Sequence, residues 1–554
     1  MSEIWHVFGK GELQELIGLS TLERLGVLLP ALMKDGADPD VIHYKETLCR
    51  IFESFAGPAA FLDREFRHRF LNHLTSQQID RLIRETGTQV SGQGFEEKVS
   101  ALVARGWSDP GFCEKVAACL GLPEEFVPHL PSQVPSELVF PAALRPFKTL
   151  KDYQSAVFHV AEKRMAAPNA RFVLQMPTGS GKTRTAMELV TQLLNRADER
   201  TVVVWLAHAK ELCEQAYECF LEVWGHVGAS PVRVLRCWGP NSALTYDFND
   251  KALVIGGFQK LQSLLTRNAV PFDELRNRVA LIVVDEAHKV LAPTYSTVTH
   301  AFRGDSSRIV GLTATPGRST LEADENAALA EFFFNQIVTI PAGEEGVIAH
   351  LRKRRVLAEA QYEPLTTDLK FELSSRERAH LEHEFDLPEG VLRRIGTDDV
   401  RNLEILKRLQ RECERASSIL FFGCSVEHSR FICANLIFLG VRAAHLDGAT
   451  PSGQRDHLIA EFRRGALQVL CNYGVLSTGF DAPKTDVVFI SRPTASIVLY
   501  SQMIGRGLRG PAIGGTEVCK IIDVKDNIIG YADQSRTYDY FKEYFEGSER
   551  LINQ

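Results

Sequence analysis

An apolar run near the middle of the sequence ends in two neighbouring acids. Residues 281–284 predict a buried strand, and Asp285, Glu286 and His288 follow it with no turn residue between. Burying two carboxylates is costly unless a positive partner lies beside them. The pattern therefore predicts a bound cation at the end of this strand, because solvated acids capping a strand end are common only for a single acid.

A glycine-rich segment supplies the other half of such a site. The segment QMPTGSGKTRTAMEL, residues 175–189, follows a short apolar run and opens a helix at Lys182. Gly179 and Gly181 allow backbone N–H groups to turn inward around an anion, and the helix N-terminus adds a positive dipole. The strict pattern GxxxxGK[ST] is missed at Met176. The strand–loop–helix context still predicts a phosphate-binding loop.

Four side chains of these two segments could carry out ATP hydrolysis. Lys182 would reach the β- and γ-phosphates, and the Thr183 hydroxyl would hold Mg²⁺. Asp285 would also bind Mg²⁺, and Glu286 would orient and deprotonate the attacking water. The other residues of the loop that we expect to bind ATP are Thr178, Gly179, Ser180, Gly181 and Arg184.

The composition is that of a globular protein with several domains. The chain has 554 residues, 45% hydrophobic and 24% charged, and a formal net charge of -7. This acidic balance excludes a basic coat for nucleic acid but not a local basic cleft. The 11 cysteines stand singly, the N-terminus has no signal-peptide pattern, and no apolar run approaches the ~20 residues that span a membrane. We expect a cytoplasmic protein with reduced thiols and no membrane partner.

Hydrophobic patterning divides the chain into five parts. Residues 1–127 carry apolar residues at helical spacing and predict an all-helical N-terminal domain, and residues 128–148 are rich in proline and predict a linker. Residues 149–345 and 346–525 alternate β-branched runs with helices, which indicates two tandem α/β domains with parallel sheets. Residues 526–554 predict a helical tail that packs back on the core.

A series of motifs resembles superfamily 2 helicases of the DEAD/DEAH type, and is similar to the branch shared with helicase subunits of type III restriction enzymes. In the first α/β domain these motifs are LKDYQ (150–154), VVWLAHAKELCEQ (203–215), LVIGGFQKL (253–261), DEAH (285–288) and LTATPGR (312–318). In the second they are ILFFGCSVEHS (419–429), AHLDGAT (444–450), VLSTGFDAP (475–483) and SQMIGRGLRG (501–510). The resemblance implies two RecA-like domains and an ATP-dependent helicase or translocase, with DNA favoured over RNA.

Arg506 and Arg509 lie three residues apart, so both guanidinium groups can point to one place from a single helix face. Two surface arginines are the usual explanation of such a spacing. Supplied across a cleft, however, they would stabilise charge on the γ-phosphate, an effect of about 10³–10⁵ in rate for arginine fingers. The surrounding motif favours this second interpretation.

The resemblance implies roles for further residues of the nucleotide site. Gln154 would recognise adenine, and Gln502 would place the water or the phosphate. Gly479 and Asp481 would join the nucleotide to the nucleic-acid track. The residues expected to couple hydrolysis to domain motion are His288, Thr313 and Thr315.

Contacts to nucleic acid are expected on the phosphate backbone, which suits translocation. The resemblance implies that the contacts are His208, Lys210, Phe258, Gln259, Ser425, Ser477 and Thr478. The basic run at residues 352–355 is either a solvated charge cluster or a further phosphate contact.

Two other functions fit the same sequence. One is an RNA helicase or remodelling enzyme with the same engine. The other is an ATP-gated scaffold that binds a protein partner through residues 1–127. A nuclease is rejected, because the chain after Arg509 is short and Glu96 and Lys98 fall in a helical pattern. DNA repair or defence against foreign DNA is the expected role.

Overall fold

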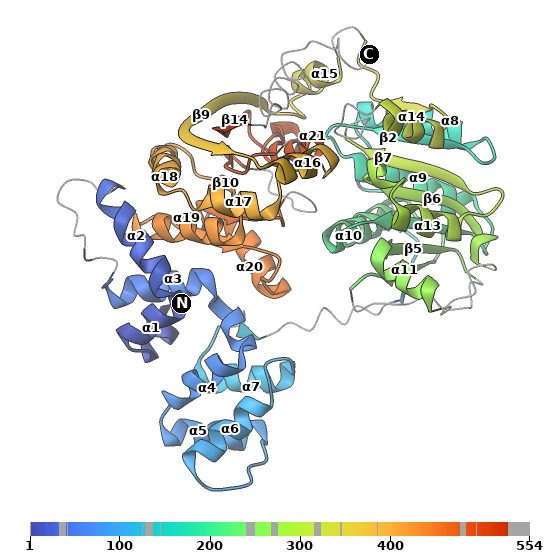
Figure 1. Ribbon diagram of the computed structural model, residues 1–554. Coiled ribbons are helices and arrows are strands. Elements are labelled where there is room, and N and C mark those ends of the chain that lie inside the picture. The colour runs from blue at the N-terminus through green and yellow to red at the C-terminus, as the bar shows by residue number, and fades with distance from the viewer. Residues whose placement is uncertain are drawn as a thin grey trace.

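The computed structural model describes residues 2–32, 40, 43–123, 126–127, 137–143, 146–239, 250–267, 275–314, 323–343, 346–384, 386–476, 484–494 and 496–529. A run of helices is followed by two α/β domains, each built on its own sheet (Figure 1). This confirms the predicted fold class. No helix of the described residues is long and apolar enough to cross a membrane.

The N-terminal part consists of short amphipathic helices. Several have defined ends: the Asp63 carboxylate accepts a hydrogen bond from Phe66 N at 2.7 Å, Thr75 and Gln78 form a capping box, and Gly87 ends its helix in the left-handed conformation. The elements are η1 (Ser2–Val7), α1 (Lys10–Ile17), α2 (Leu19–Leu32), α3 (Lys45–Phe55), η3 (Gly57–Leu62), α4 (Arg64–Asn72), α5 (Ser76–Thr86), α6 (Phe95–Ala104) and α7 (Pro110–Leu120).

Domain 1 is an eight-stranded sheet in the order β1-β4-β5-β3-β6-β7-β2-β8. Alternate residues of its central strands face two separate cores, so that α8, α9 and α10 cover one face and α11, α13 and α14 cover the other. The elements after β1 are α8 (Asp152–Met165), β2 (Arg171–Gln175), α9 (Lys182–Arg196), β3 (Val202–Ala207), α10 (Lys210–Val227), β4 (Val232–Cys237), β5 (Ala252–Gly257), α11 (Phe258–Thr266), β6 (Val279–Asp285), η5 (Ala287–Lys289), α13 (Pro293–Phe302), β7 (Arg308–Thr313), α14 (Ala323–Phe332) and β8 (Ile337–Thr339).

Strand β1 (Glu137–Phe140) lies within the segment that the prolines predicted to be a linker. It pairs antiparallel with β4 at the edge of an otherwise parallel sheet, and Glu137 forms an ion pair with Arg233 of that strand. An edge strand needs hydrogen bonds on one side only, so it tolerates proline-rich flanks. Part of residues 128–148 is therefore built into domain 1.

Domain 2 is a six-stranded parallel sheet in the order β11-β12-β10-β13-β14-β9. The elements are α15 (Val347–Lys353), β9 (Glu359–Glu372), α16 (Ser375–Glu384), α17 (Glu389–Gly396), α18 (Asp399–Cys413), β10 (Ile419–Phe422), α19 (Val426–Phe438), β11 (Ala443–Leu446), α20 (Ser452–Arg463), β12 (Val469–Asn472), β13 (Val487–Ile490), α21 (Ile497–Ile504), η7 (Pro511–Ile513) and β14 (Val518–Ile529).

The predicted helical tail begins too early in the sequence. Strand β14 continues to Ile529 because the long strand β9 pairs with it up to Glu372, so residues 526–529 are strand. The rest of the predicted tail lies outside the described residues.

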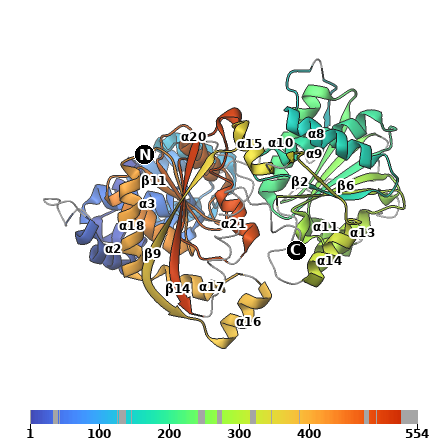
Figure 2. The same ribbon diagram turned by 90° about the horizontal axis from the view of Figure 1, so that it is seen from above.

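Helices α2 and α3 pack directly on α18 and α19 of domain 2, and the buried residues of the two parts form one hydrophobic cluster. The guanidinium of Arg24 lies 4.5 Å from the centre of the Phe431 ring and donates to Asp399 at 2.9 Å. Seen from above, α2 lies on the side of domain 2 that faces away from domain 1 (Figure 2). The N-terminal helices therefore extend domain 2 and share its core.

Candidate nucleotide site

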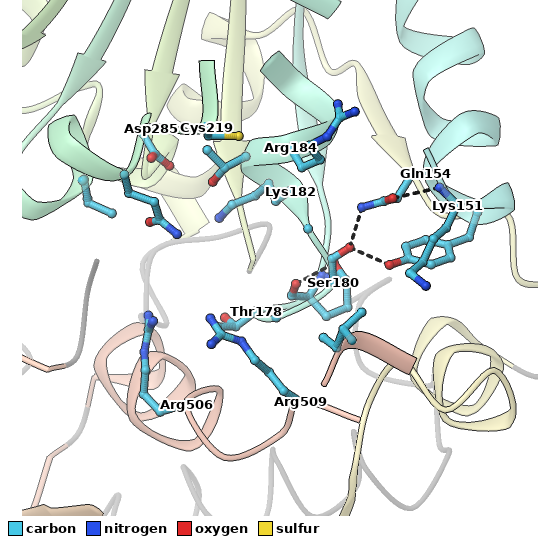
Figure 3. A pocket seen from close by; sticks show the side chains of 18 of the residues that line it. Lys151, Gln154, Thr178, Ser180, Lys182, Arg184, Cys219, Asp285, Arg506 and Arg509 are labelled. Atoms are coloured by element: carbon cyan, nitrogen blue, oxygen red, sulfur yellow. Dashed lines mark hydrogen bonds between the residues drawn. The ribbon is translucent and has the colours of Figure 1, made fainter. Parts of the chain in front are cut away.

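A cavity of ≈ 390 Å³ lies between the two domains, within the size range of small-molecule sites. Arg506 and Arg509 of domain 2 point across it toward Lys182 and Asp285 of domain 1 (Figure 3). The side chains and loop residues that line it are Lys148, Thr149, Lys151, Tyr153, Gln154, Pro177, Thr178, Gly179, Ser180, Gly181, Lys182, Thr183, Arg184, Leu212, Gln215, Cys219, Asp285, Glu286, Gln502, Arg506, Arg509 and Ile513.

The glycine-rich loop connects β2 to α9 as the sequence predicted. Gly179 and Gly181 have φ of 83° and 86°, a left-handed conformation that glycine adopts at low cost. A Cβ on Gly181 would lie 2.2 Å from Gln154 Nε2, so a larger residue there would also displace that side-chain amide. The open loop and the free first turn of α9 form a cradle suited to phosphate groups.

Two residues of the LKDYQ motif (150–154) form hydrogen bonds to the backbone of the glycine-rich loop. The Ser180 carbonyl accepts hydrogen bonds from the Tyr153 hydroxyl at 2.8 Å and from Gln154 Nε2 at 3.3 Å. Gln154 Oε1 accepts from the backbone N–H of Lys151 at 3.0 Å. Both ends of the Gln154 amide are thus bound to protein in this conformation, at the wall of the cavity.

The two acids stand at the end of β6, on the same domain 1 side of the cavity as the loop. Asp285 and Glu286 are 4% and 9% exposed, and Glu286 has a left-handed φ of 55°. Asp285 Oδ1 accepts from the Glu286 N–H at 3.0 Å, and His288 Nδ1 lies 3.4 Å from Glu286 Oε2. Strained backbone of this kind is concentrated at functional sites.

The electrostatic surroundings shift the pKa values of the two acids in opposite directions. Burial raises the pKa of Asp285 to about 6, although the charge of Lys182 opposes this. Burial also acts on Glu286, but the positive charges of Lys182 and Lys289 oppose it, and the pKa of that carboxyl is lowered. Glu286 is therefore ionised at neutral pH, as a general base must be. A buried carboxylate such as Asp285, next to a threonine hydroxyl and a phosphate cradle, is a donor set that fits Mg²⁺.

The domain 2 wall is the end of α21 and the turn that follows it. Arg506 Nε donates to the Gln502 carbonyl at 3.2 Å, and burial lowers the pKa of both Arg506 and Arg509 to about 10. A Cβ on Gly505 would lie 2.4 Å from Thr178 Cγ2, so the helix end packs tightly against the phosphate loop. Arg506 thus reaches the cavity as a buried charged group, and Arg509 reaches it partly exposed.

Two of the predicted coupling residues fall among the described residues. Thr313 is 3% exposed at the end of β7, and its carbonyl accepts from Met176 N at 3.1 Å, which joins its strand to the phosphate loop. His288 is buried against Glu286. The other predicted residues of this kind, Thr315, Gly479 and Asp481, lie outside the described residues.

The predicted nucleic-acid contacts are not equally placed. Gln259 is exposed, and Lys210 forms an exposed ion pair with Glu214 at 3.4 Å. Ser425 caps α19 by accepting from His428 N at 3.1 Å. Burial and the charge of Lys289 lower the pKa of His208 to about 4, so it is neutral beside Glu286. Ser477 and Thr478 lie outside the described residues.

Phe258 does not fit the role that the motif suggested. Its side chain is 0% exposed and its ring centre lies 3.9 Å from that of Tyr295, inside the core beneath α11 and α13. The motif places a phenylalanine at the start of α11, but the sequence does not show that a tyrosine from α13 covers it. A nucleic-acid strand cannot reach the Phe258 ring without displacing Tyr295.

The basic run at residues 352–355 is partly neutralised. Arg354 lies 3.3 Å from Asp152 of domain 1, and Arg355 forms an ion pair with Glu517. These pairs are exposed and join α15 to neighbouring elements, which favours the solvated interpretation of the run.

Other contacts across the cleft involve residues that the sequence did not single out. Arg455 of α20 donates to Glu211 of α10 at 2.6 Å, and Lys151 Nζ donates to the Ala512 carbonyl at 3.1 Å. Glu211 and Arg455 are 244 positions apart, so no spacing could have linked them. Tyr153, by contrast, could have been identified from the sequence, because it lies next to Gln154 in the LKDYQ motif.

A phosphate-binding loop, two acids at the end of another strand of the same sheet and two arginines from a second domain define a nucleotide hydrolase whose site is complete only when the domains meet. Comparison with known proteins agrees. Residues 147–318 match the family model described as type III restriction enzyme, res subunit, and residues 401–510 match the helicase conserved C-terminal domain.

Individual relatives cover the same region. The chain is 26% identical over 380 residues to a 51.5 kDa protein of a Lactococcus phage, covering 68% of this chain and 70% of that protein. It is 26% identical over 384 residues to the putative ATP-dependent helicase IRC3 of Saccharomyces cerevisiae, covering 68% of this chain but only 51% of that protein. A fragment structure of a putative HsdR subunit of a type I restriction enzyme from Vibrio vulnificus has the same fold, with a TM-score of 0.50, 16% identity and coverage of 79% of this chain and 72% of that one.

The chain belongs to the superfamily 2 ATP-dependent helicases and carries both the restriction-type ATPase domain and the helicase C-terminal domain.

Proposed function

We propose that the protein is an ATP-dependent DNA helicase or translocase. The observation that carries this proposal is a cavity in which acids and a phosphate loop from domain 1 face a buried arginine, Arg506, and a partly exposed one, Arg509, from domain 2. The choice of DNA over RNA is supported by the restriction-enzyme family model matched by residues 147–318.

Each wall of the cavity has a distinct task in ATP hydrolysis. Lys182 and the loop N–H groups bind the β- and γ-phosphates. Thr183 and Asp285 would hold Mg²⁺, which would neutralise phosphate charge when bound. Glu286, ionised at neutral pH, orients the attacking water and accepts its proton. Arg506 and Arg509 stabilise the charge that develops on the γ-phosphate, while Gln502 helps to place the water or the phosphate.

Domain closure converts this reaction into movement. Because Lys182 and Glu286 belong to one domain and the arginines to the other, ATP is hydrolysed only in the closed cleft. His288, Thr313 and Thr315 report the nucleotide state to the strand-binding surface, with Gly479 and Asp481 acting from the second domain. His208, Lys210, Gln259, Ser425, Ser477 and Thr478 hold the phosphate backbone of the strand.

The biological setting follows from the same features. A role in DNA repair or in defence against foreign DNA suits a sequence-independent motor of the restriction type. The cytoplasm, where thiols stay reduced, suits a chain whose described cysteines are all free. Residues 1–127 share a core with domain 2, so a protein bound there would move with that domain.

The test is ATP hydrolysis measured with no polynucleotide, with single-stranded DNA, with duplex DNA and with RNA. We expect strong stimulation by DNA and none with the Glu286→Gln variant. Stimulation by RNA alone would replace DNA with RNA as the substrate. Stimulation by none of the three would point to the second candidate, a scaffold triggered by a protein partner of the N-terminal helices.

A further inference from the structure

Helix α21 carries Gln502 toward the nucleotide cavity, the turn that follows it carries Arg506, and a buried tyrosine lies elsewhere on the helix. It is capped by Ser496, whose Oγ accepts from Leu499 N at 3.2 Å, and it ends just before Gly505. Gln502 lines the nucleotide cavity, whereas Tyr500 is 3% exposed and packed away from solvent. Residues two apart on a helix point in different directions. Tyr500 is therefore directed to something other than the nucleotide.

The Tyr500 hydroxyl contacts a carboxylate on β14 of the domain 2 sheet, between β13 and β9. It donates to Asp523 Oδ2 at 3.3 Å, and Asp523 is 6% exposed on β14. The residues beside Asp523 in the neighbouring strands are Ile490 on β13 and Pro364 on β9, neither of which carries charge. A carboxylate in such a place costs stability that an apolar residue would not, so packing alone does not account for it.

The other charges near Asp523 lie on its own strand. Lys525 opposes the effect of burial on the carboxyl and Asp526 adds to it, while Asp526 is itself ion-paired with Arg401 at 2.8 Å. Burial dominates and raises the pKa of Asp523 to about 7. The Asp523 carboxyl thus changes its charge in the neutral pH range, where the enzyme is expected to work. Its hydrogen bond to Tyr500 is strongest when the carboxyl is charged.

The position of α21 leaves little room for movement. Beyond the Gly505 contact with Thr178, a Cβ on Gly507 would lie 2.3 Å from Cys519 Sγ and 2.7 Å from Val488 Cγ2. The turn that bears Arg506 is therefore wedged between the phosphate loop and the sheet. A small rotation of α21 would displace the guanidinium, and misplacement by about 1 Å can reduce a rate by about 10²-fold.

We propose that Asp523 is a positioning residue for ATP hydrolysis: through the Tyr500 hydroxyl it fixes α21 against the sheet and so sets where Gln502 and Arg506 stand in the closed cleft. Asp523 does not line the nucleotide cavity. The proposal rests on the proposed function, because it requires the residues of α21 to act on ATP.

The experiment compares Asp523→Asn and Tyr500→Phe with the wild-type full chain, measuring kcat and KM for ATP between pH 6 and 8.5. Both variants keep the shape of the side chain. We expect kcat to fall about ten-fold at pH 8 with KM for ATP nearly unchanged, since α21 misplaces groups that act in the transition state. At pH 6, where wild-type Asp523 is protonated, the ratio of the Asp523→Asn rate to the wild-type rate should approach one.

Thermal unfolding separates positioning from damage to the fold. Asp523 is held neutral by burial, so its folded pKa lies above the unfolded value, and the wild type loses stability as pH rises from about 4 toward 7. Asp523→Asn removes that loss and should melt higher than the wild type at pH 8 while hydrolysing ATP more slowly. A variant that is more stable and slower cannot owe its slowness to misfolding.

Each contrary result has a definite meaning. A rate ratio that stays at one, or that is reduced equally at all pH values, would overturn the positioning role while leaving the proposed function intact, provided Glu286→Gln is inactive. Ordinary hydrolysis by Glu286→Gln would instead reject the proposed function. Asp368→Asn, on the exposed face of β9, serves as the matched control and should match the wild type throughout.

Discussion

Domain 1 brings two carboxylates, a lysine and a backbone loop to the nucleotide cavity, whereas domain 2 brings two guanidinium groups and an amide. The domain 1 wall is held by local structure: Gly179 and Gly181 shape the loop, and β6 delivers Asp285 and Glu286 at one strand end. The domain 2 wall depends on the seating of one short helix, α21, against the loop of the other domain. One wall is preformed, and the other becomes part of the site only by closure.

The largest expected effect lies on the wall that depends on closure. Arg506→Ala and Arg509→Ala should each lower kcat by about 10³-fold or more, because a guanidinium worth about 10³–10⁵ in rate is removed from the γ-phosphate. Binding of ATP to domain 1 should persist. The measurement is steady-state hydrolysis beside equilibrium binding of a fluorescent ATP analogue, and loss of both together would show that the arginines act mainly in binding.

On the preformed wall, Glu286→Gln should reduce kcat by about 10²–10⁴-fold, the range for removal of a general base. Lys182→Ala should also abolish turnover, but by loss of phosphate binding. Equilibrium ATP binding distinguishes the two: it should survive in Glu286→Gln and fail in Lys182→Ala. Equal binding by both variants would contradict the division of tasks on this wall.

A methyl group can test the fit between the two walls. Gly505→Ala should lower kcat/KM for ATP by roughly 10²-fold, since its Cβ would lie 2.4 Å from Thr178 Cγ2 and displace the arginine turn. Gly390→Ala, which has no atom within 4 Å of the added Cβ, is the matched control. Comparable activity of the two variants would mean that the domains do not approach this closely during hydrolysis.

The smallest effect concerns closure away from the nucleotide. Arg455→Ala should reduce kcat/KM for ATP by about two- to five-fold at low salt, the value of a partly exposed ion pair, and the difference should shrink at high salt. Glu211→Ala should behave in the same way. The double variant should be no worse than either single variant, and additive losses would show that the pair does not act as a unit.

The two walls also differ in how far the sequence could predict them. Lys182, Asp285 and Glu286 were predicted because short local patterns, a strand followed by a glycine loop or by two acids, determine their surroundings. Arg506 and Arg509 required the family resemblance, since RxxR is common on surfaces. The role of Gly505 against Thr178 depends on how two domains dock, which a single sequence does not encode in any spacing.

The same limit explains where the predictions failed. Phe258 was assigned to the strand contacts from its motif position, but burial by Tyr295 is a tertiary fact. The edge strand at Glu137–Phe140 was hidden among prolines, and the length of β14 was set by its partner β9. The fold class and the domain 1 wall could be predicted from local sequence patterns. The edge strand β1, the end of β14 and the contacts between the domains could not, because they depend on residues distant in the sequence.

The shared core of the N-terminal helices and domain 2 has a consequence for the synthesis of the protein. Arg24 contacts Asp399 across 375 positions of sequence, and Leu25 and Leu28 of α2 are buried in that core. The apolar face of the N-terminal helices therefore stays exposed until domain 2 has been synthesised. Most of the described chain must have left the ribosome by then. Such long-range pairing slows folding and favours aggregation of the unfinished chain. The N-terminal helices are thus translated before domain 2 but reach their final packing only with it.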